Sequence, residues 1–183
     1  MPHEPDGVID YGATPAEAVV LSGDTNTDAL IIGSRWKDFD VTYSFIDNNL
    51  DYSNVDDQND WVSQLSALQQ TAAINWFAQF ASVSGLTFTQ LSGAEGEQDE
   101  DQEATIRLAN GTAGTAFGYY PHGSERGGDI IFGGTGDNPD LGDFDWATVG
   151  HEIGHALGLA HGHEGDGLSG TLEANYNSLE YSI

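Results

Sequence analysis

The stretch HEIGHALGLAH, from His151 to His161, decides how the rest of this 183-residue chain is interpreted. On a helix, His151 and His155 lie one turn apart on the same face, so both imidazoles can reach one ion at about 2.0–2.1 Å. A continuing helix would carry His161 to the opposite side, about 600° beyond His155. Gly158 removes this obstacle, because a left-handed glycine can end the helix and turn the chain back toward the ion.

The same stretch places a carboxylate beside the three imidazoles. Three neutral histidines leave one position of a zinc ion open, and zinc lowers the pKa of water bound there to roughly 7. Glu152 can accept that proton and pass it to a leaving amine, while the ion polarises the scissile carbonyl. The motif fixes five positions, which are His151, Glu152, His155, Gly158 and His161. These residues would occur together by chance in a chain of this length with odds on the order of 10⁻⁵. We therefore predict one catalytic Zn²⁺ held by His151, His155 and His161, with Glu152 as the general base of peptide hydrolysis.

Other candidate metal sites are weaker. His163, followed by Glu164, could compete for the ion, but the spacing favours His161. His122 lies in a glycine-containing loop and is interpreted as an exposed loop histidine rather than a ligand of a second metal. The acidic loop GGTGDNPDLGDFDWA (133–147) contains one GGxGxD-like string. A single copy is not a repeat array, so turn chemistry is favoured there and a Ca²⁺ site stays an open alternative.

The charge balance excludes several classes of partner. Thirty acidic residues give a net charge of −26 against four cations, which are Arg35, Lys37, Arg107 and Arg126. Such a field repels nucleic acid and anionic membrane surfaces, and it suits a solvated surface in salty surroundings. The chain has no cysteine, which excludes disulfides and thiolate ligands. Residues 1–12 lack the features of a signal peptide, and no apolar run approaches the roughly 18 residues of a membrane span.

The hydrophobic pattern predicts an α+β (mixed α/β) fold. Strands are expected in five segments, which are 41–46, 86–91, 104–108, 115–120 and 127–134. Apolar residues at three- and four-residue steps from Trp61 to Val83 predict a long core helix. A second helix is expected to begin near Trp146, capped by Asp143 or Asp145. Residues 1–28, rich in Pro, Gly and Asp, are interpreted as an extended N-terminal arm before a domain at 29–183.

The long histidine motif is the zinc signature of the metzincins, and the chain from Ala29 onward resembles the catalytic domain of a serralysin-type metalloprotease. Supporting segments occur in the family's order: IIGSRW (31–36), VTYSF (41–45), INWF (74–77), LTFTQL (86–91), ATIRLA (104–109), AFGYYP (116–121) and GGDIIF (127–132). The resemblance implies a metzincin-like zincin domain, with a twisted mixed sheet of about five strands, a long backing helix and a zinc-binding helix. It also implies an edge strand within 114–120 that pairs with an extended protein or peptide substrate, and secretion from a bacterium without an N-terminal signal peptide.

Two features depart from the family pattern. Gly162 stands where serralysins usually have proline, and the methionine turn that should follow EYSI is absent, since the sole methionine is Met1. The domain is therefore expected to be truncated before the methionine turn. Truncation, self-cleavage and a separate chain that supplies the missing C-terminal segment all stay open.

Three functions are compared on this basis. A zinc endopeptidase is favoured. The second is an inactive or self-processed zinc-binding fragment, or a zymogen form in which the propeptide-like arm, with His3, Glu4 and Asp6, blocks the site. The third is an extracellular binding module that holds calcium.

Overall fold

The computed structural model describes residues 14–53, 55–92 and 103–177. Its elements in chain order are β1 (Ala16–Ala18), α1 (Thr25–Ala29), β2 (Ser34–Trp36), β3 (Asp40–Phe45), the 3-10 helix η1 (Asn49–Asp51), α2 (Val55–Asp60), β4 (Trp61–Ser63), α3 (Ala67–Ser84), β5 (Thr87–Gln90), β6 (Ile106–Gly111), β7 (Phe117–Gly118), β8 (Ile130–Phe132) and α4 (Phe144–Ala156). None of the helices in these ranges has the length and apolarity that crossing a bilayer requires.

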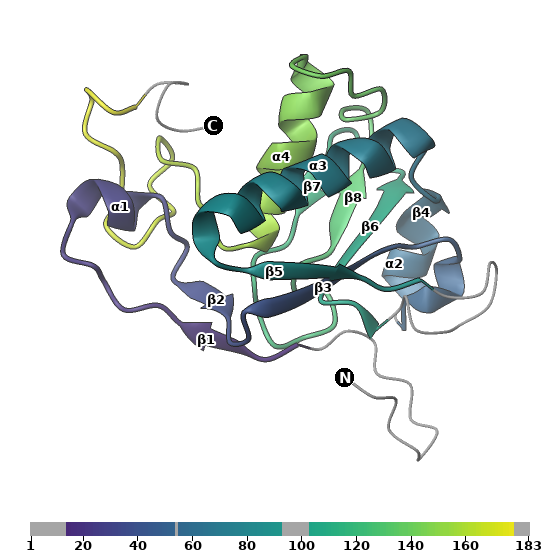
Figure 1. Ribbon diagram of the computed structural model, residues 1–183, viewed down its shortest axis with the longest axis horizontal. Helices are drawn as coiled ribbons and strands as arrows, with labels where there is room; N and C mark the ends of the chain where they lie inside the picture. Colours follow the sequence, from purple (N-terminus) through teal and green to yellow (C-terminus); the bar gives the residue numbers. More distant parts are fainter. Residues whose placement is uncertain (1–13, 54, 93–102, 178–183) are drawn as a thin grey trace.

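The main sheet is mixed, as predicted (Figure 1). Its strand order is β5-β3-β6-β8-β7, and β4 pairs with the end of β6. The pairs β3–β5, β3–β6 and β6–β8 are parallel, whereas β7 runs antiparallel to β8. All five predicted strands are present, so the α+β fold is confirmed. The edge position expected for the segment 114–120 is confirmed as well, because β7 ends the order.

The two long helices lie on the same face of this sheet (Figure 1). Alternating residues of β3 point into the core beneath them, and the ring of Tyr43 stacks on Phe77 of α3 at 4.3 Å between centroids. The two helices also contact each other directly. The indole of Trp76 on α3 donates a 2.9 Å hydrogen bond to the carbonyl of Trp146 on α4. The same indole packs against Gly150 of α4. The histidine-bearing helix is therefore fixed by both the sheet and α3.

The prediction that the core helix begins at Trp61 was wrong by six residues. Trp61 belongs to β4, and the helix begins after Ser66. The Ser66 hydroxyl accepts from the Gln69 N–H at 3.3 Å, and the Gln69 side chain accepts from the Ser66 N–H at 2.9 Å. This reciprocal capping box satisfies two otherwise unpaired N–H groups. It fixes the start of the helix more strongly than apolar spacing does.

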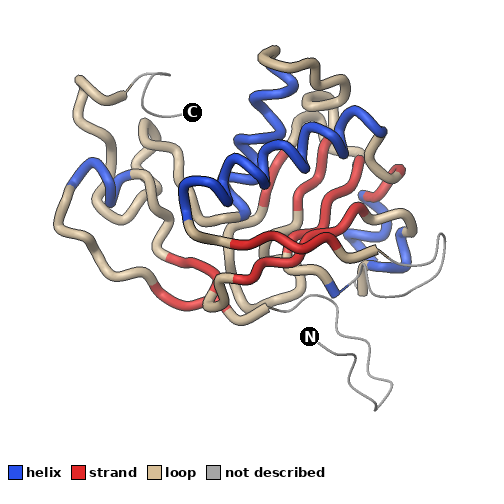
Figure 2. Tube along the Cα trace, viewed as in Figure 1, coloured by secondary structure: helices blue, strands red, loops and turns tan. Residues whose placement is uncertain are grey.

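The N-terminal part of the described chain is bound to the segment that follows α4 (Figure 2). Leu30 O accepts from Ala160 N at 2.8 Å, and Ile32 N donates to Gly158 O at 3.0 Å. Leu168 N donates to Ile31 O at 2.9 Å. We call residues 30–32 the N-terminal clasp. The predicted arm overlaps α1 and β1, while His3, Glu4 and Asp6 lie outside the described residues.

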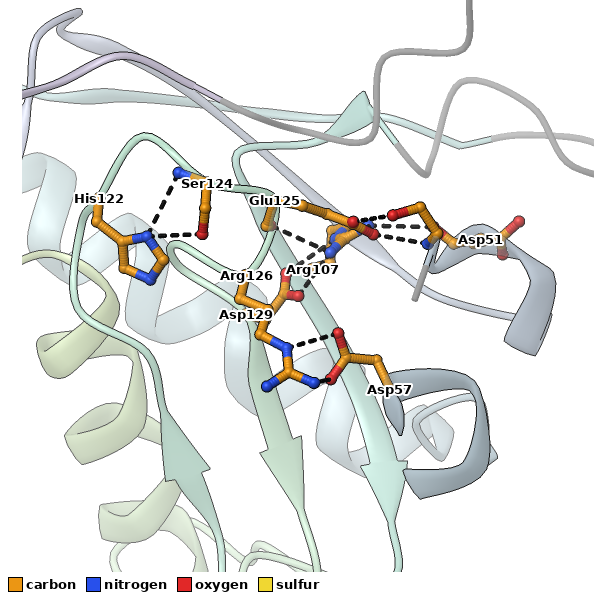
Figure 3. Close-up of polar contacts among 9 residues, drawn as sticks. Asp51, Asp57, Arg107, His122, Ser124, Glu125, Arg126 and Asp129 are labelled. Carbon is orange, nitrogen blue, oxygen red and sulfur yellow. Dashed lines mark hydrogen bonds and ion pairs between the residues drawn. The ribbon is translucent and has the colours of Figure 1, made fainter. Parts of the chain in front are cut away.

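A buried ion pair joins β6 to the loop before β8 (Figure 3). Arg107 is fully buried and donates two hydrogen bonds to Asp129, at 2.8 Å from Nε and 2.6 Å from Nη2. It also donates to the carbonyl of Asp51 at 3.1 Å. Burial alone opposes the charge on Arg107, but the carboxylate of Asp129 raises the pKa of the guanidinium above its usual range. Removing one partner would leave an uncompensated buried charge, which typically costs about 3–5 kcal/mol.

Candidate metal centre

The helix α4 is capped as predicted. Asp143 is the N-cap, and its side chain accepts from the Trp146 N–H at 2.7 Å. Asp145 accepts instead from Gly136 N at 3.0 Å and Asn138 N at 3.1 Å. Both carboxylates thus bond to backbone N–H groups, which is the turn chemistry favoured for this loop.

The turn that brings back the third histidine is confirmed at Gly158. The helix ends at Ala156, and Gly158 has φ +99°, a left-handed conformation that favours glycine. A Cβ at this position would lie 2.6 Å from the carbonyl oxygen of Ser34, so a side chain would also be excluded sterically. From there the N-terminal clasp holds the chain on its course to His161.

The structure brings His151, His155 and His161 together at one point. Their Nε2 atoms are 2.9, 2.9 and 3.0 Å apart, and the three side chains form a group that could hold a metal ion. The three Nε2 atoms are close enough together for all of them to bind one zinc ion at the usual Zn–N distance of roughly 2.0–2.1 Å. The donor set of three imidazoles suits zinc.

Two of these rings are oriented through their other nitrogen. His155 Nδ1 lies 2.8 Å from the carbonyl oxygen of Leu159, and His161 Nδ1 lies 2.9 Å from Oε2 of Glu164. Carbonyl and carboxylate oxygens only accept, so each Nδ1 carries the proton and each Nε2 offers its lone pair to the shared point. Such partners usually accompany metal-binding histidines.

The electrostatics favour the neutral forms of His151 and His155. Burial, followed by the neighbouring His155, lowers the pKa of His151 from 6.5 to about 4. Burial also lowers the pKa of His155, although its contact with Leu159 works in the opposite direction. At neutral pH both rings are therefore in the neutral form, which leaves a nitrogen lone pair for a metal ion.

Glu152 also lies on α4, and its carboxyl group is buried, with 6% of the residue's surface exposed. Burial raises its pKa from 4.5 to about 7, while His161 and the backbone N–H of Gly118 act in the opposite direction. The interaction with Gly118 places the carboxyl group beside β7, the edge strand. A carboxyl group with this pKa can exchange protons near neutrality.

The two other histidines that the structure describes, His122 and His163, do not belong to this group. The ring of His163 is 5.6 Å from that of His161, and its Nε2 lies 3.6 Å from Glu164. His122 is exposed and shares a hydrogen bond with the hydroxyl of Ser124 at 2.8 Å, so its interpretation as a loop histidine is confirmed (Figure 3).

Sequence reasoning missed three residues around the site. The orienting role of Glu164 follows from its place three residues after His161, which could have been noticed. The hydroxyl of Tyr120 donates to Asp166 at 3.1 Å, and its ring packs edge-to-face on His155. The Tyr120–Asp166 bond joins residues 46 positions apart, so no local sequence pattern indicates it. Glu164 and Asp166 also form a second acidic group with His161, and both carboxylates are exposed.

Comparison with known proteins supports the interpretation. The chain matches no family model. It is 31% identical over 157 residues to Serralysin G of Dickeya chrysanthemi, across 78% of this chain and 30% of that protein. It is 30% identical over 169 residues to Metallopeptidase AprA of Pseudomonas marginalis, across 85% of this chain and 34% of the relative. Among solved structures it is similar to myroilysin, with a TM-score of 0.42 and 18% identity over 71% of this chain and 53% of that one.

A histidine pair on a helix, a third histidine beyond a glycine turn and a mixed sheet above them define a metzincin-type domain. The similarity to two serralysin-group proteins over most of the chain is more specific. This similarity supports a serralysin-type metalloprotease domain in this chain. It spans about a third of the length of the curated relatives that it matches.

Proposed function

We propose that this domain is a zinc-dependent endopeptidase. The observation that carries the proposal is the convergence of three Nε2 atoms within 3.0 Å of one another, with the buried carboxyl group of Glu152 on the same helix. His151, His155 and His161 would hold the ion. This arrangement supports hydrolysis over a calcium-binding module, because a module of that kind needs no proton acceptor between two histidines.

A zinc ion in this position would supply Lewis-acid activation of a water molecule and of the scissile carbonyl. The chain's own contribution is the proton transfer. Glu152 accepts the proton of the attacking water and returns it to the leaving amine nitrogen. Its pKa of about 7 leaves a large carboxylate population at neutral pH while keeping the group basic enough to take a proton.

The edge strand β7 would bind the substrate. Tyr119 directs its N–H to Asp129 and its carbonyl to Gly128, at 2.9 and 3.2 Å. Neighbouring residues of an extended segment alternate in direction, so Gly118 and Tyr120, on either side of Tyr119, direct their backbone groups away from β8. The N–H of Gly118 interacts there with Glu152. An extended peptide can add there as a further strand, and main-chain pairing of this kind is tolerant of substrate sequence.

For the whole protein we propose secretion and extended protein or peptide substrates. The net charge of −26 argues against nucleic acid and anionic membranes as partners. Zinc is the only metal that this proposal requires.

The test of the proposal is Glu152→Gln. The amide is nearly isosteric but cannot accept the proton, so hydrolysis of casein should fall by roughly 10²–10⁴-fold while one zinc per chain is retained. Glu173→Gln removes the same charge from an exposed position and should leave the rate unchanged. Undiminished hydrolysis by Glu152→Gln would refute the role of Glu152, and a wild-type chain without stoichiometric zinc would refute the metal site.

A further inference from the structure

The loop that carries His161 is anchored to the N-terminal clasp at both ends. Ala160 bonds to Leu30 just before the histidine, and Leu168 bonds to Ile31 after it. Between these anchors, residues 161–167 form an irregular loop whose Glu164 and Asp166 are exposed. Within the loop, Gly162 O accepts from Leu172 N at 2.7 Å and Glu164 N donates to His161 O at 3.3 Å. Side-chain contacts therefore matter most in the part of the loop around Asp166.

Tyr120 provides such a contact from the opposite side. Its hydroxyl donates to Oδ2 of Asp166 at 3.1 Å. Its ring meets the imidazole of His155 edge-to-face, with 5.3 Å between centroids and 82° between planes. One side chain thus contacts a histidine on α4 and also holds the loop that carries the third histidine.

Glu164 connects this contact to His161. Its carboxylate lies 2.9 Å from Nδ1 of His161 and belongs to the same short loop as Asp166. If Asp166 is released, the loop gains freedom between its two anchors. Glu164 then no longer holds the His161 ring in a single orientation.

We propose that the Tyr120–Asp166 hydrogen bond is a tether that positions His161 for metal binding, with Tyr120 as a positioning residue. The inference deepens the proposed function and rests on its metal site. The bond joins the segment after the edge strand to the loop of the third ligand. Removing it leaves all three imidazoles in the chain but makes their convergence costlier in conformational entropy.

Zinc affinity, measured by competition with a chromophoric chelator on the full chain, tests the tether. Tyr120→Phe keeps the ring on His155 and removes only the hydroxyl. We expect it to weaken zinc binding by roughly tenfold, the lower end of what partners that orient metal ligands contribute. Asp166→Ala should lower the zinc affinity by the same factor, and the double variant should bind zinc no more weakly than either single variant. Asp166→Asn keeps an accepting oxygen and should stay within about threefold of wild type.

Tyr119→Phe is the matched control. This neighbouring ring packs against Phe117 and faces the guanidinium of Arg126, so zinc affinity should not change. The melting temperature of each metal-free variant separates positioning from general destabilisation, and the tether predicts that it stays at the wild-type value.

Specific results would overturn the inference. If wild type binds zinc and Tyr120→Phe binds it equally well, the tether is refuted and the proposed function stands. Additive losses in the double variant, or a fall in metal-free melting temperature that accounts for the lost affinity, would refute it too. So would a raised KM with unchanged zinc affinity, since Tyr120 would then act on substrate. A wild-type chain that binds no zinc would refute the proposed function itself.

Discussion

Burial shifts the pKa of Glu152 and the pKa of the histidines His151 and His155 in opposite directions. Burial favours the uncharged form of both kinds of group, so it makes the histidines available as ligands and makes the carboxyl group a stronger base. The pKa of His151 falls to about 4, and that of Glu152 rises to about 7. One environment thus prepares both halves of the proposed chemistry.

The difference between the pKa values of Glu152 and His151 predicts how kcat/KM falls as the pH is lowered. Glu152 acts as a base only when ionised, so kcat/KM should fall about tenfold per pH unit below its pKa. A bound cation favours the carboxylate, which places this limb at or below about pH 7. His151 stays unprotonated down to about pH 4, so zinc should remain bound over much of the range in which activity declines. Bound zinc and kcat/KM measured on the same samples test this. Simultaneous loss of both would contradict it.

Gly158 is the residue on which the third ligand depends. In Gly158→Ala the left-handed φ of +99° alone costs about 1–3 kcal/mol, and the new methyl group meets the carbonyl of Ser34. At about 2–4 °C per kcal/mol the melting temperature should fall by several degrees, and zinc affinity should fall with it. Gly123→Ala is the control, since nothing lies within 4 Å of a Cβ there. Equal behaviour of the two variants would argue against the turn.

At the scale of elements, the sequence predicts what depends on local pattern. The strands follow from alternation, α4 follows from Asp143 and the histidine spacing, and the turn follows from Gly158. The predicted start of α3 was wrong because the capping box at Ser66, and not the spacing of apolar residues, determines where the helix begins. The clasp and the Tyr120–Asp166 bond could not be predicted, because they join segments far apart in the chain through contacts that leave no periodic trace.

The approach of α3 to α4 gives a prediction for two helical glycines. A Cβ at Gly150 would lie 2.4 Å from the indole of Trp76, whereas a Cβ at Gly154 would have its nearest contact at 3.5 Å. Alanine gains up to about 1 kcal/mol of helix propensity at either site, but overpacking at Gly150 typically costs about 1–3 kcal/mol. Thermal unfolding of the metal-free chains should show Gly150→Ala less stable than wild type and Gly154→Ala at least as stable. The reverse order would refute the close packing.

At the scale of the whole molecule, negative charge dominates. The net charge is −26. Among the residues that the structure describes, Arg35, Arg107 and Arg126 form ion pairs with Glu17, Asp129 and Asp57. The remaining acidic groups repel one another, which destabilises the compact state. Salt weakens that repulsion, because the screening length falls from about 10 Å at 0.1 M to about 3 Å at 1 M.

The melting temperature should therefore rise with NaCl. Relief of about 1–2 kcal/mol of repulsion corresponds to a few degrees in a domain of this size. Differential scanning calorimetry at pH 7 from 0.1 to about 1 M NaCl measures the effect. As the pH approaches the sequence pI of about 4.1, the salt effect should shrink, because the net charge disappears. A salt response that is equal at both pH values would rule out self-repulsion as its cause.

The N-terminal clasp has a consequence for the order in which the molecule is made. Residues 30–32 leave the ribosome long before the segment that they hold, and His161 has no fixed place until the two meet. Before that contact forms, a metal ion can be bound only by His151 and His155, and two ligands bind it more weakly than three. We therefore expect tight metal binding only after the N-terminal clasp has paired with the segment that follows α4, that is, after the whole domain has folded. Loss of the clasp would release the segment that carries His161.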